Sequence, residues 1–98
     1  MKLLTQEIKN KIPKLHETSE QEDPRVYVKF FDPTGSWTWY GMEFDGKDTF
    51  YGYVDGFEGE YGYFSLSELQ SVKGAFGLGI ERDIYWDDKT TMKSVLGE

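Results

Sequence analysis

The sequence has no cysteine and only one histidine among its 98 residues. The lack of cysteine excludes disulfide bonds and thiolate chemistry, and one histidine cannot supply a histidine-based zinc site. No apolar run approaches the roughly 18 residues that a membrane-spanning helix requires. The first residues also lack the apolar stretch and the small-residue cleavage site of a signal peptide. We therefore expect a cytoplasmic protein without a bound cofactor, a metal ion or a membrane contact.

Aliphatic side chains are also scarce, so aromatic residues form a large part of the apolar total. Hydrophobic residues make up 38% of the chain and aromatic residues 17%, while charged residues reach 30%. Leucine, isoleucine, valine and phenylalanine together still exceed about one fifth of the chain, the level below which highly charged chains stay disordered. The sequence predicts one domain over 1–98, with a core that depends on aromatic packing.

Negative charge is in excess, but it is unevenly distributed along the chain. There are 18 acidic and 11 basic side chains, a net charge of −7. Residues 1–15 carry four lysines and one glutamate, a net charge of +3, which leaves −10 for residues 16–98. Phosphate backbones and anionic membranes repel such a surface, so direct binding to nucleic acid is not expected. Two interpretations stay open: a surface charged for solubility, or a face that attracts a basic partner protein.

Alternating β-branched and aromatic residues with tight turns between them predict an antiparallel meander. Strands are expected at 25–31, 37–44, 50–54 and 60–64. Ser65 and Glu68 match a capping box, so a helix is expected to follow the fourth strand and cover the sheet. Thr5 is suited to cap a short N-terminal helix at 6–11. The expected fold class is α+β, with four or five strands.

The other segments are interpreted from their polarity. Residues 1–23 are expected to form a helical arm and an exposed polar linker, 24–86 the folded core, and 87–98 a polar, mostly exposed tail. Glycines indicate a loop at 74–79. Periodicity does not decide between strand and helix for 80–86, and the sequence does not indicate an oligomeric state.

The third and fourth expected strands carry tyrosines at alternate positions, between acidic residues. Tyr51 and Tyr53 share one face of a strand, as do Tyr61 and Tyr63. Tyrosine combines rigid contact area with a polar tip, which suits protein interfaces. We expect these strands to form an acidic surface that contacts a basic protein. Its expected residues are Glu43, Asp45, Asp48, Tyr51, Tyr53, Asp55, Glu58, Glu60 and Tyr61.

An alternative function of a different class uses two tryptophans and two carboxylates. Trp37 and Trp39 fall on one face of a strand, where exposed rings stack on sugars and buried rings fill a core. Glu81 and Asp83 have the spacing that glycoside hydrolysis requires. This alternative is a small carboxylate-based hydrolase or a carbohydrate-binding domain, and it requires these side chains to converge on one cleft.

Seven motifs lie between residues 11 and 86, namely Lys11–Leu15, Val26–Pro33, Trp37–Tyr40, Asp48–Phe50, Val54–Glu58, Gly62–Leu69 and Ile80–Tyr85. Together they resemble a family of short bacterial proteins of unknown function. Members of that family occur on plasmids, conjugative elements and phages. The resemblance implies a cytoplasmic protein of a mobile element, with no activity, cofactor or catalytic residue to carry over.

Composition and resemblance together predict a non-enzymatic binding module that engages a basic protein surface. By analogy, small acidic proteins of phages and plasmids occupy basic surfaces of host defence or nucleic-acid enzymes, some of them as mimics of DNA. The physical basis is that carboxylates at phosphate-like spacing form charge-assisted hydrogen bonds with arginine and lysine.

Overall fold

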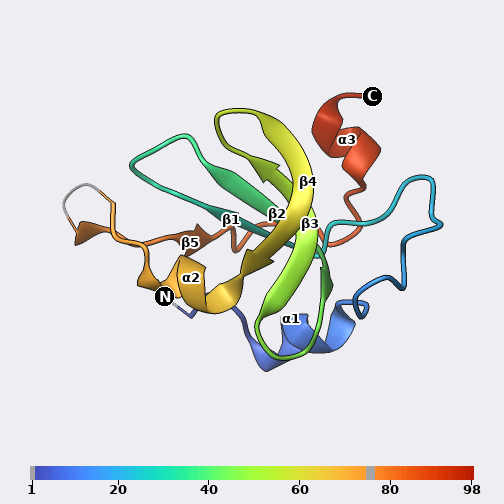
Figure 1. Cartoon of the computed structure of the whole chain (residues 1–98), viewed down its shortest axis with the longest axis horizontal. Coiled ribbons are helices and arrows are strands. Elements are labelled where there is room, and N and C mark those ends of the chain that lie inside the picture. The colour runs from blue at the N-terminus through green and yellow to red at the C-terminus, as the bar shows by residue number, and fades with distance from the viewer. Residues whose placement is uncertain (1, 75–76) are drawn as a thin grey trace.

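The computed structural model of the chain describes residues 2–74 and 77–98. Within them, one antiparallel sheet has the strand order β4-β3-β2-β1-β5 (Figure 1). The strands are β1 Val28–Phe31, β2 Thr38–Phe44, β3 Thr49–Asp55, β4 Gly59–Ser65 and β5 Glu81–Arg82. The helices are α1 Gln6–Lys11, α2 Leu66–Ser71 and α3 Met92–Leu96. The expected α+β meander, with a short N-terminal helix and a helix after the fourth strand, is confirmed. Part of the loop expected at 74–79 lies outside the described residues.

The turn between β2 and β3 shows how local chemistry sets the meander. Gly46 takes a φ of +86°, a left-handed conformation that glycine adopts without strain. The Asp45 carboxylate accepts backbone N–H bonds from Lys47, Asp48 and Thr49 at 2.8–3.0 Å. The acidic residue and the glycine together close the turn between the two strands.

The main core covers one face of the sheet and is largely aromatic. Phe50 packs against Phe30, Phe44 and Phe64, with ring centroids 5.5, 4.4 and 5.1 Å apart. Leu69 of α2 closes this core, together with three residues that flank α1. Those three residues are Leu3, Leu4 and Ile12, each exposed by 9% or less. The basic N-terminal segment is therefore packed into the fold.

A second, smaller core lies on the other face of the sheet and includes the C-terminal helix. Met92 of α3 is 2% exposed and packs with Val26 and Met42. Residues 87–98 are mostly exposed, as expected, but the buried Met92 holds this segment against the sheet. Thr91 caps α3, and the three-residue spacing of Met92 and Val95 gives the short helix one apolar side.

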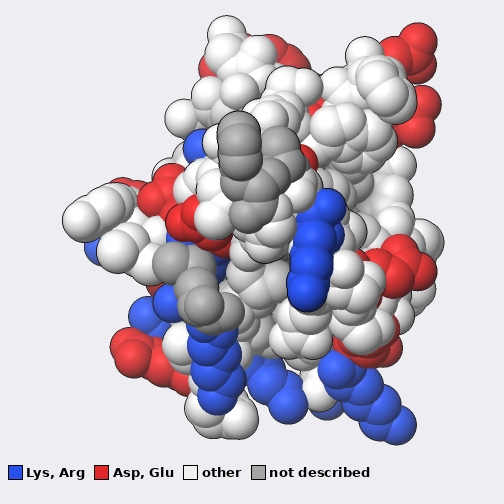
Figure 2. Space-filling model, turned by 90° about the vertical axis from the view of Figure 1, so that its left-hand side faces the viewer, with Lys and Arg blue, Asp and Glu red and all other residues white. Residues whose placement is uncertain are grey.

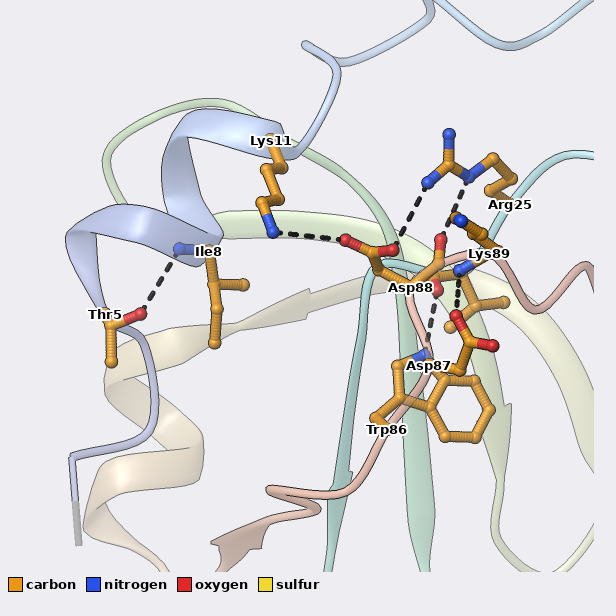
Figure 3. Close-up of polar contacts among 9 residues, drawn as sticks. Thr5, Ile8, Lys11, Arg25, Trp86, Asp87, Asp88 and Lys89 are labelled. Carbon is orange, nitrogen blue, oxygen red and sulfur yellow. Dashed lines mark hydrogen bonds and ion pairs between the residues drawn. The ribbon is translucent and has the colours of Figure 1, made fainter.

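The undecided segment 80–86 begins as the short strand β5 and then leaves the sheet. The indole of Trp86 donates a hydrogen bond of 2.8 Å to the Val26 carbonyl. Beyond it, Asp88 forms ion pairs with Lys11 and Arg25, each at 3.4 Å (Figure 3). Exposed pairs of this kind contribute little stability individually. No described helix is long and apolar enough to cross a membrane.

A tyrosine-lined groove as the candidate functional site

The tyrosines of β3 and β4 are brought together on one face of the sheet. The register places Tyr51 opposite Tyr63 and Tyr53 opposite Tyr61. Ring centroids are 5.1 Å apart for Tyr51 and Tyr63, 5.1 Å for Tyr53 and Tyr61, and 6.4 Å for Tyr51 and Tyr61. Tyr61 is 49% exposed and Tyr63 57% exposed. We call these four residues the tyrosine cluster.

The cluster continues across the sheet toward the C-terminal segment. Tyr40 lies 6.3 Å from Tyr53 and 5.8 Å from Trp86, measured between ring centroids. Burial raises the pKa of Tyr40, and the nearby Asp55 carboxylate and Tyr53 raise it further. The phenol of Tyr40 therefore stays neutral, so it adds contact area beside the tyrosine cluster and no charge.

A groove of about 370 Å³ lies between this tyrosine cluster and the loop at 16–24. Tyr51, Tyr61 and Tyr63 line it on the sheet side, together with Met42 and Glu43. The loop supplies the opposite wall, from His16 to Pro24. Since the polar loop and the aromatic strands face each other here, a bound segment would meet aromatic rings on one side and polar groups on the other.

Glu43 lies at this groove, but it is buried, contrary to its expected place on an exposed surface. Its side chain accepts hydrogen bonds from the backbone N–H groups of His16 and Thr18, at 2.8 and 2.9 Å, and from the Thr18 hydroxyl. Glu43 is 3% exposed and Thr18 is 6% exposed. The physical reason is a register shift between Gly41 and Glu43, which places Glu43 opposite Tyr51 and toward the loop.

The hydrogen bonds to Glu43 also determine its charge state. Burial alone raises the pKa of this carboxyl, but the hydrogen bonds from Thr18 and His16, and the proximity of the His16 side chain, outweigh it. The net effect is a pKa below the ordinary value. His16 takes a φ of +72°, which is uncommon for a residue other than glycine. The expected exposed linker is thus a loop anchored on a buried carboxylate.

Asp45 and Asp48 lie at one end of the sheet and take part in local structure. Asp48 accepts hydrogen bonds from the Ser65 hydroxyl at 2.5 Å and from the Ser67 N–H at 2.8 Å. These bonds join the turn before β3 to the start of α2. Hydrogen bonding lowers the pKa of both aspartates. Their carboxylates are therefore occupied by turn and cap contacts and do not lie in the groove.

Asp55, Glu58 and Glu60 lie at the opposite end of β3 and β4 and are exposed. Phe57, in the same turn, is 95% exposed. The structure therefore brings together the tyrosines of the expected surface and divides its carboxylates between two ends of the hairpin. Alternation along a strand further places Asp55 on the face of Tyr53 and Glu60 on the other face.

Other carboxylates, which the sequence reasoning did not select, lie beside the groove. Glu22 lines it, and Asp23 and Glu98 are close enough to affect Tyr61. Burial, the neighbouring Tyr51 and Tyr53, and these two carboxylates all raise the pKa of Tyr61. These acidic residues come from distant parts of the sequence, and no local motif joins them to the tyrosines.

Several basic side chains lie at the end of the molecule that holds α1. Figure 2 shows lysine and arginine side chains concentrated in the lower half of one face, at the end of the molecule where α1 and α2 lie. Lys2, Lys9 and Lys47 line a hollow there. This hollow and the groove have no lining residue in common.

The residues of the alternative site are spread over different parts of the sheet. Trp37 and Trp39 pack together, 6.0 Å apart, and Trp37 also contacts Phe57 at 5.4 Å. Trp39 is opposite Phe30 in the register, whereas Glu81 is opposite Phe31. Adjacent residues of a strand face opposite sides of a sheet, so Trp39 and Glu81 are on different faces. The ammonium group of Lys29 lies 3.9 Å from the Asp83 carboxylate.

The fold and the groove define a small α+β domain with an aromatic, carboxylate-flanked surface. Among residues 2–74 and 77–98, no group of three or more histidine, cysteine or acidic residues is placed to hold a metal ion. The chain belongs to the DUF2958 family, described as a protein of unknown function, whose family model matches residues 3–97. No curated protein matches the chain, and no solved structure does.

Proposed function

We propose that the protein is a non-enzymatic binding module whose tyrosine-lined groove engages a basic segment of another protein. The observation that carries this proposal is the packed tyrosine cluster, with Tyr61 and Tyr63 each about half exposed at the groove. Tyrosine rings held by their neighbours lose little conformational entropy on binding, and their hydroxyl groups keep polar contacts available. These are properties of a protein contact surface.

The charge around the groove supports a basic partner. Glu22 lines the groove, Asp23 and Glu98 are close enough to raise the pKa of Tyr61, and the chain as a whole carries a net charge of −7. Arginine and lysine bind aromatic faces by cation–π attraction and bind carboxylates by charge-assisted hydrogen bonds. Long-range attraction between the acidic body and a basic partner would also raise the rate of encounter.

The molecule itself contains a small example of the chemistry that we propose. The ammonium group of Lys29 lies 5.9 Å from the ring centroid of Tyr40 and 5.6 Å from that of Trp86. Asp83 completes this arrangement with its ion pair to Lys29. The Lys29 ammonium group therefore lies against Tyr40 and Trp86, which continue the tyrosine cluster across the sheet. The Asp83 carboxylate lies beside it.

The proposal extends to the setting in which the protein acts. From the family resemblance, we propose that it acts in the cytoplasm, as a product of a plasmid, phage or other mobile element. The basic surfaces available to such a protein include those of host nucleic-acid enzymes, and blocking one of them would be an anti-defence activity. This part of the proposal depends on the resemblance and not on the groove.

The test is a titration of the protein with an arginine-rich peptide. A glutamate-rich peptide of equal length is the control of opposite charge. The double variant Tyr61→Ala and Tyr63→Ala should bind the arginine-rich peptide about tenfold more weakly or worse, as expected for loss of aromatic contact residues. Tyr85→Ala is the matched control, because Tyr85 is 90% exposed and does not line the groove. Equal affinities for all three proteins, or equal binding of both peptides, would contradict the proposal.

A further inference from the structure

The strand β4 forms one edge of the sheet and has no partner on its outer side. It pairs only with β3 in the sheet order. Among the described residues, no hydrogen bond joins the backbone of residues 59–64 to any segment other than β3. In an antiparallel strand, every second residue turns both its N–H and its C=O away from its partner. The outer edge of β4 therefore offers a row of free backbone donors and acceptors.

The two edges of the sheet differ in how they are protected. β5 is two residues long, and short edge strands give other chains little to pair with. β4 is seven residues long and pairs with β3 in unbroken register from Gly59 to Ser65. It contains no proline, lysine or bulge, which are the usual devices against pairing with another chain. An edge left open in this way is suited to strand addition.

The side chains of β4 indicate what kind of strand would fit. Tyr61 and Tyr63 cover one face beside the edge, and both line the groove. On the other face, a Cβ atom built at Gly62 has no atom within 4 Å, so a neighbouring side chain has room there. Glu60 is exposed next to this space, and Glu58 directly precedes the strand. A partner strand would thus meet tyrosines on one face and carboxylate charge with open space on the other.

Charge argues against a second copy of this chain as the occupant. A second copy would bring a further net charge of −7 to a chain that already carries −7. Like charges across paired strands are destabilising. A strand with lysine or arginine at alternate positions would instead place its cations on one face, beside Glu60, and its apolar side chains on the other face, beside the tyrosine rings.

We infer that β4 is a docking edge to which a basic, extended segment of a partner protein adds as a sixth strand. The inference rests on the proposed function and specifies its partner, since strand addition gives affinity through backbone hydrogen bonds and specificity through alternate side chains. It assigns the recognition to the main chain of 59–65, together with Tyr61, Tyr63 and Glu60.

The test uses a peptide of alternating lysine and valine, and a second peptide of identical sequence whose backbone amides are N-methylated. Both have the same side-chain charge, but the methylated peptide cannot pair as a strand. We expect the unmodified peptide to bind at least about tenfold more tightly, because several backbone hydrogen bonds are lost on methylation. Amide hydrogen exchange of β4 should slow on binding, while exchange in β5 stays unchanged.

Two variants with the same change in charge distinguish a contact at the β4 edge from long-range electrostatic attraction. Glu60→Lys should weaken binding of the unmodified peptide severalfold, whereas Glu7→Lys, on α1 and exposed, should leave it nearly unchanged. Equal binding of the two peptides, with the tyrosine signals perturbed but β4 exchange unaffected, overturns strand addition and leaves the proposed function standing. Failure of both peptides to bind overturns both. Concentration-dependent protection of β4 in the protein alone would assign the edge to a second copy and overturn the inference.

Discussion

At the scale of single residues, Glu43 shows how one carboxylate can organise a loop. A run of acidic residues from 43 to 60 suggested an exposed position for it. The structure instead buries its side chain against His16 and Thr18, which supply three hydrogen bonds. A buried carboxylate is tolerated only when its oxygens are satisfied in this way. The wall of the groove therefore depends on one acidic residue of β2.

Replacing this carboxylate should loosen the loop and destabilise the protein. In Glu43→Gln the amide NH₂ faces backbone donors, so at least one hydrogen bond to the loop is lost. Hydrogen bonds to charged groups contribute about 1.5–3 kcal/mol each, and we expect the free energy of unfolding at pH 7 to fall by roughly 2 kcal/mol. Urea denaturation followed by circular dichroism measures this. The control Glu60→Gln, on the exposed edge strand, should change stability by less than about 0.5 kcal/mol.

The difference in stability between the native protein and Glu43→Gln should also depend on pH. The folded-state pKa of Glu43 is lowered, so the stability it contributes is fully present above the unfolded pKa of about 4.3. That contribution is lost as the pH falls through the folded-state pKa, when the carboxylate becomes protonated in both states. The difference between the native protein and Glu43→Gln should shrink below about pH 4.3. A difference that stays constant down to pH 2 would show that the charge of Glu43 is not the cause.

At the scale of elements, the local patterns predicted strands and helices well. The strands expected at 37–44, 50–54 and 60–64 agree with β2, β3 and β4 to within one residue at each end. Turn residues and the alternation of apolar residues act between neighbours in the sequence, so tertiary packing does not change the elements that they predict. The segment at 80–86 was undecided because only two of its residues pair with β1. The segment at 92–96 is too short to show helical periodicity without knowledge of the surface on which it packs.

The C-terminal helix gives the clearest test at this scale. Met92 is 2% exposed, and its N–H donates to the Pro24 carbonyl at 2.9 Å. Met92→Ala should leave a cavity between α3 and the sheet and lower the free energy of unfolding by about 2–5 kcal/mol. Leu96→Ala is the matched control, since Leu96 is 39% exposed and should cost less than about 1 kcal/mol. Equal losses for both variants would contradict the packing described for α3.

At the scale of the whole molecule, the groove joins segments that are far apart in the sequence. Tyr51 and Tyr61 were predicted to share a surface because hairpin register is a local property. The loop at 16–24 and the C-terminal Glu98 were not predicted, because their docking depends on Glu43 and Met92 contacts that no spacing rule contains. The carboxylates selected from the sequence do not lie together, for a similar reason. Asp45 and Asp48 accept hydrogen bonds within the fold, at the end of the hairpin opposite to Asp55, Glu58 and Glu60.

The N-terminal segment has a structural role that its positive charge does not indicate. Residues 1–15 carry the basic excess, yet Leu3, Leu4 and Ile12 are buried in the main core. The Phe44 N–H also donates to the Pro13 carbonyl at 2.9 Å. Burying three such side chains contributes about 5–9 kcal/mol, a large part of the roughly 5–15 kcal/mol that stabilises a domain. A chain that begins at residue 16 should therefore lose its cooperative unfolding transition in urea.

That deletion also changes the net charge to −10, and a matched variant separates the two effects. The full-length chain with Lys2, Lys9 and Lys14 each replaced by Gln has the same net charge of −10 but keeps the buried residues. We expect it to unfold cooperatively, with a midpoint close to that of the native protein, because these three ammonium groups form no ion pair within the described residues. If the substituted chain fails to fold as well, charge balance and not core packing is what residues 1–15 supply. If the shortened chain keeps the native midpoint, the N-terminal segment is dispensable and the core is complete without it.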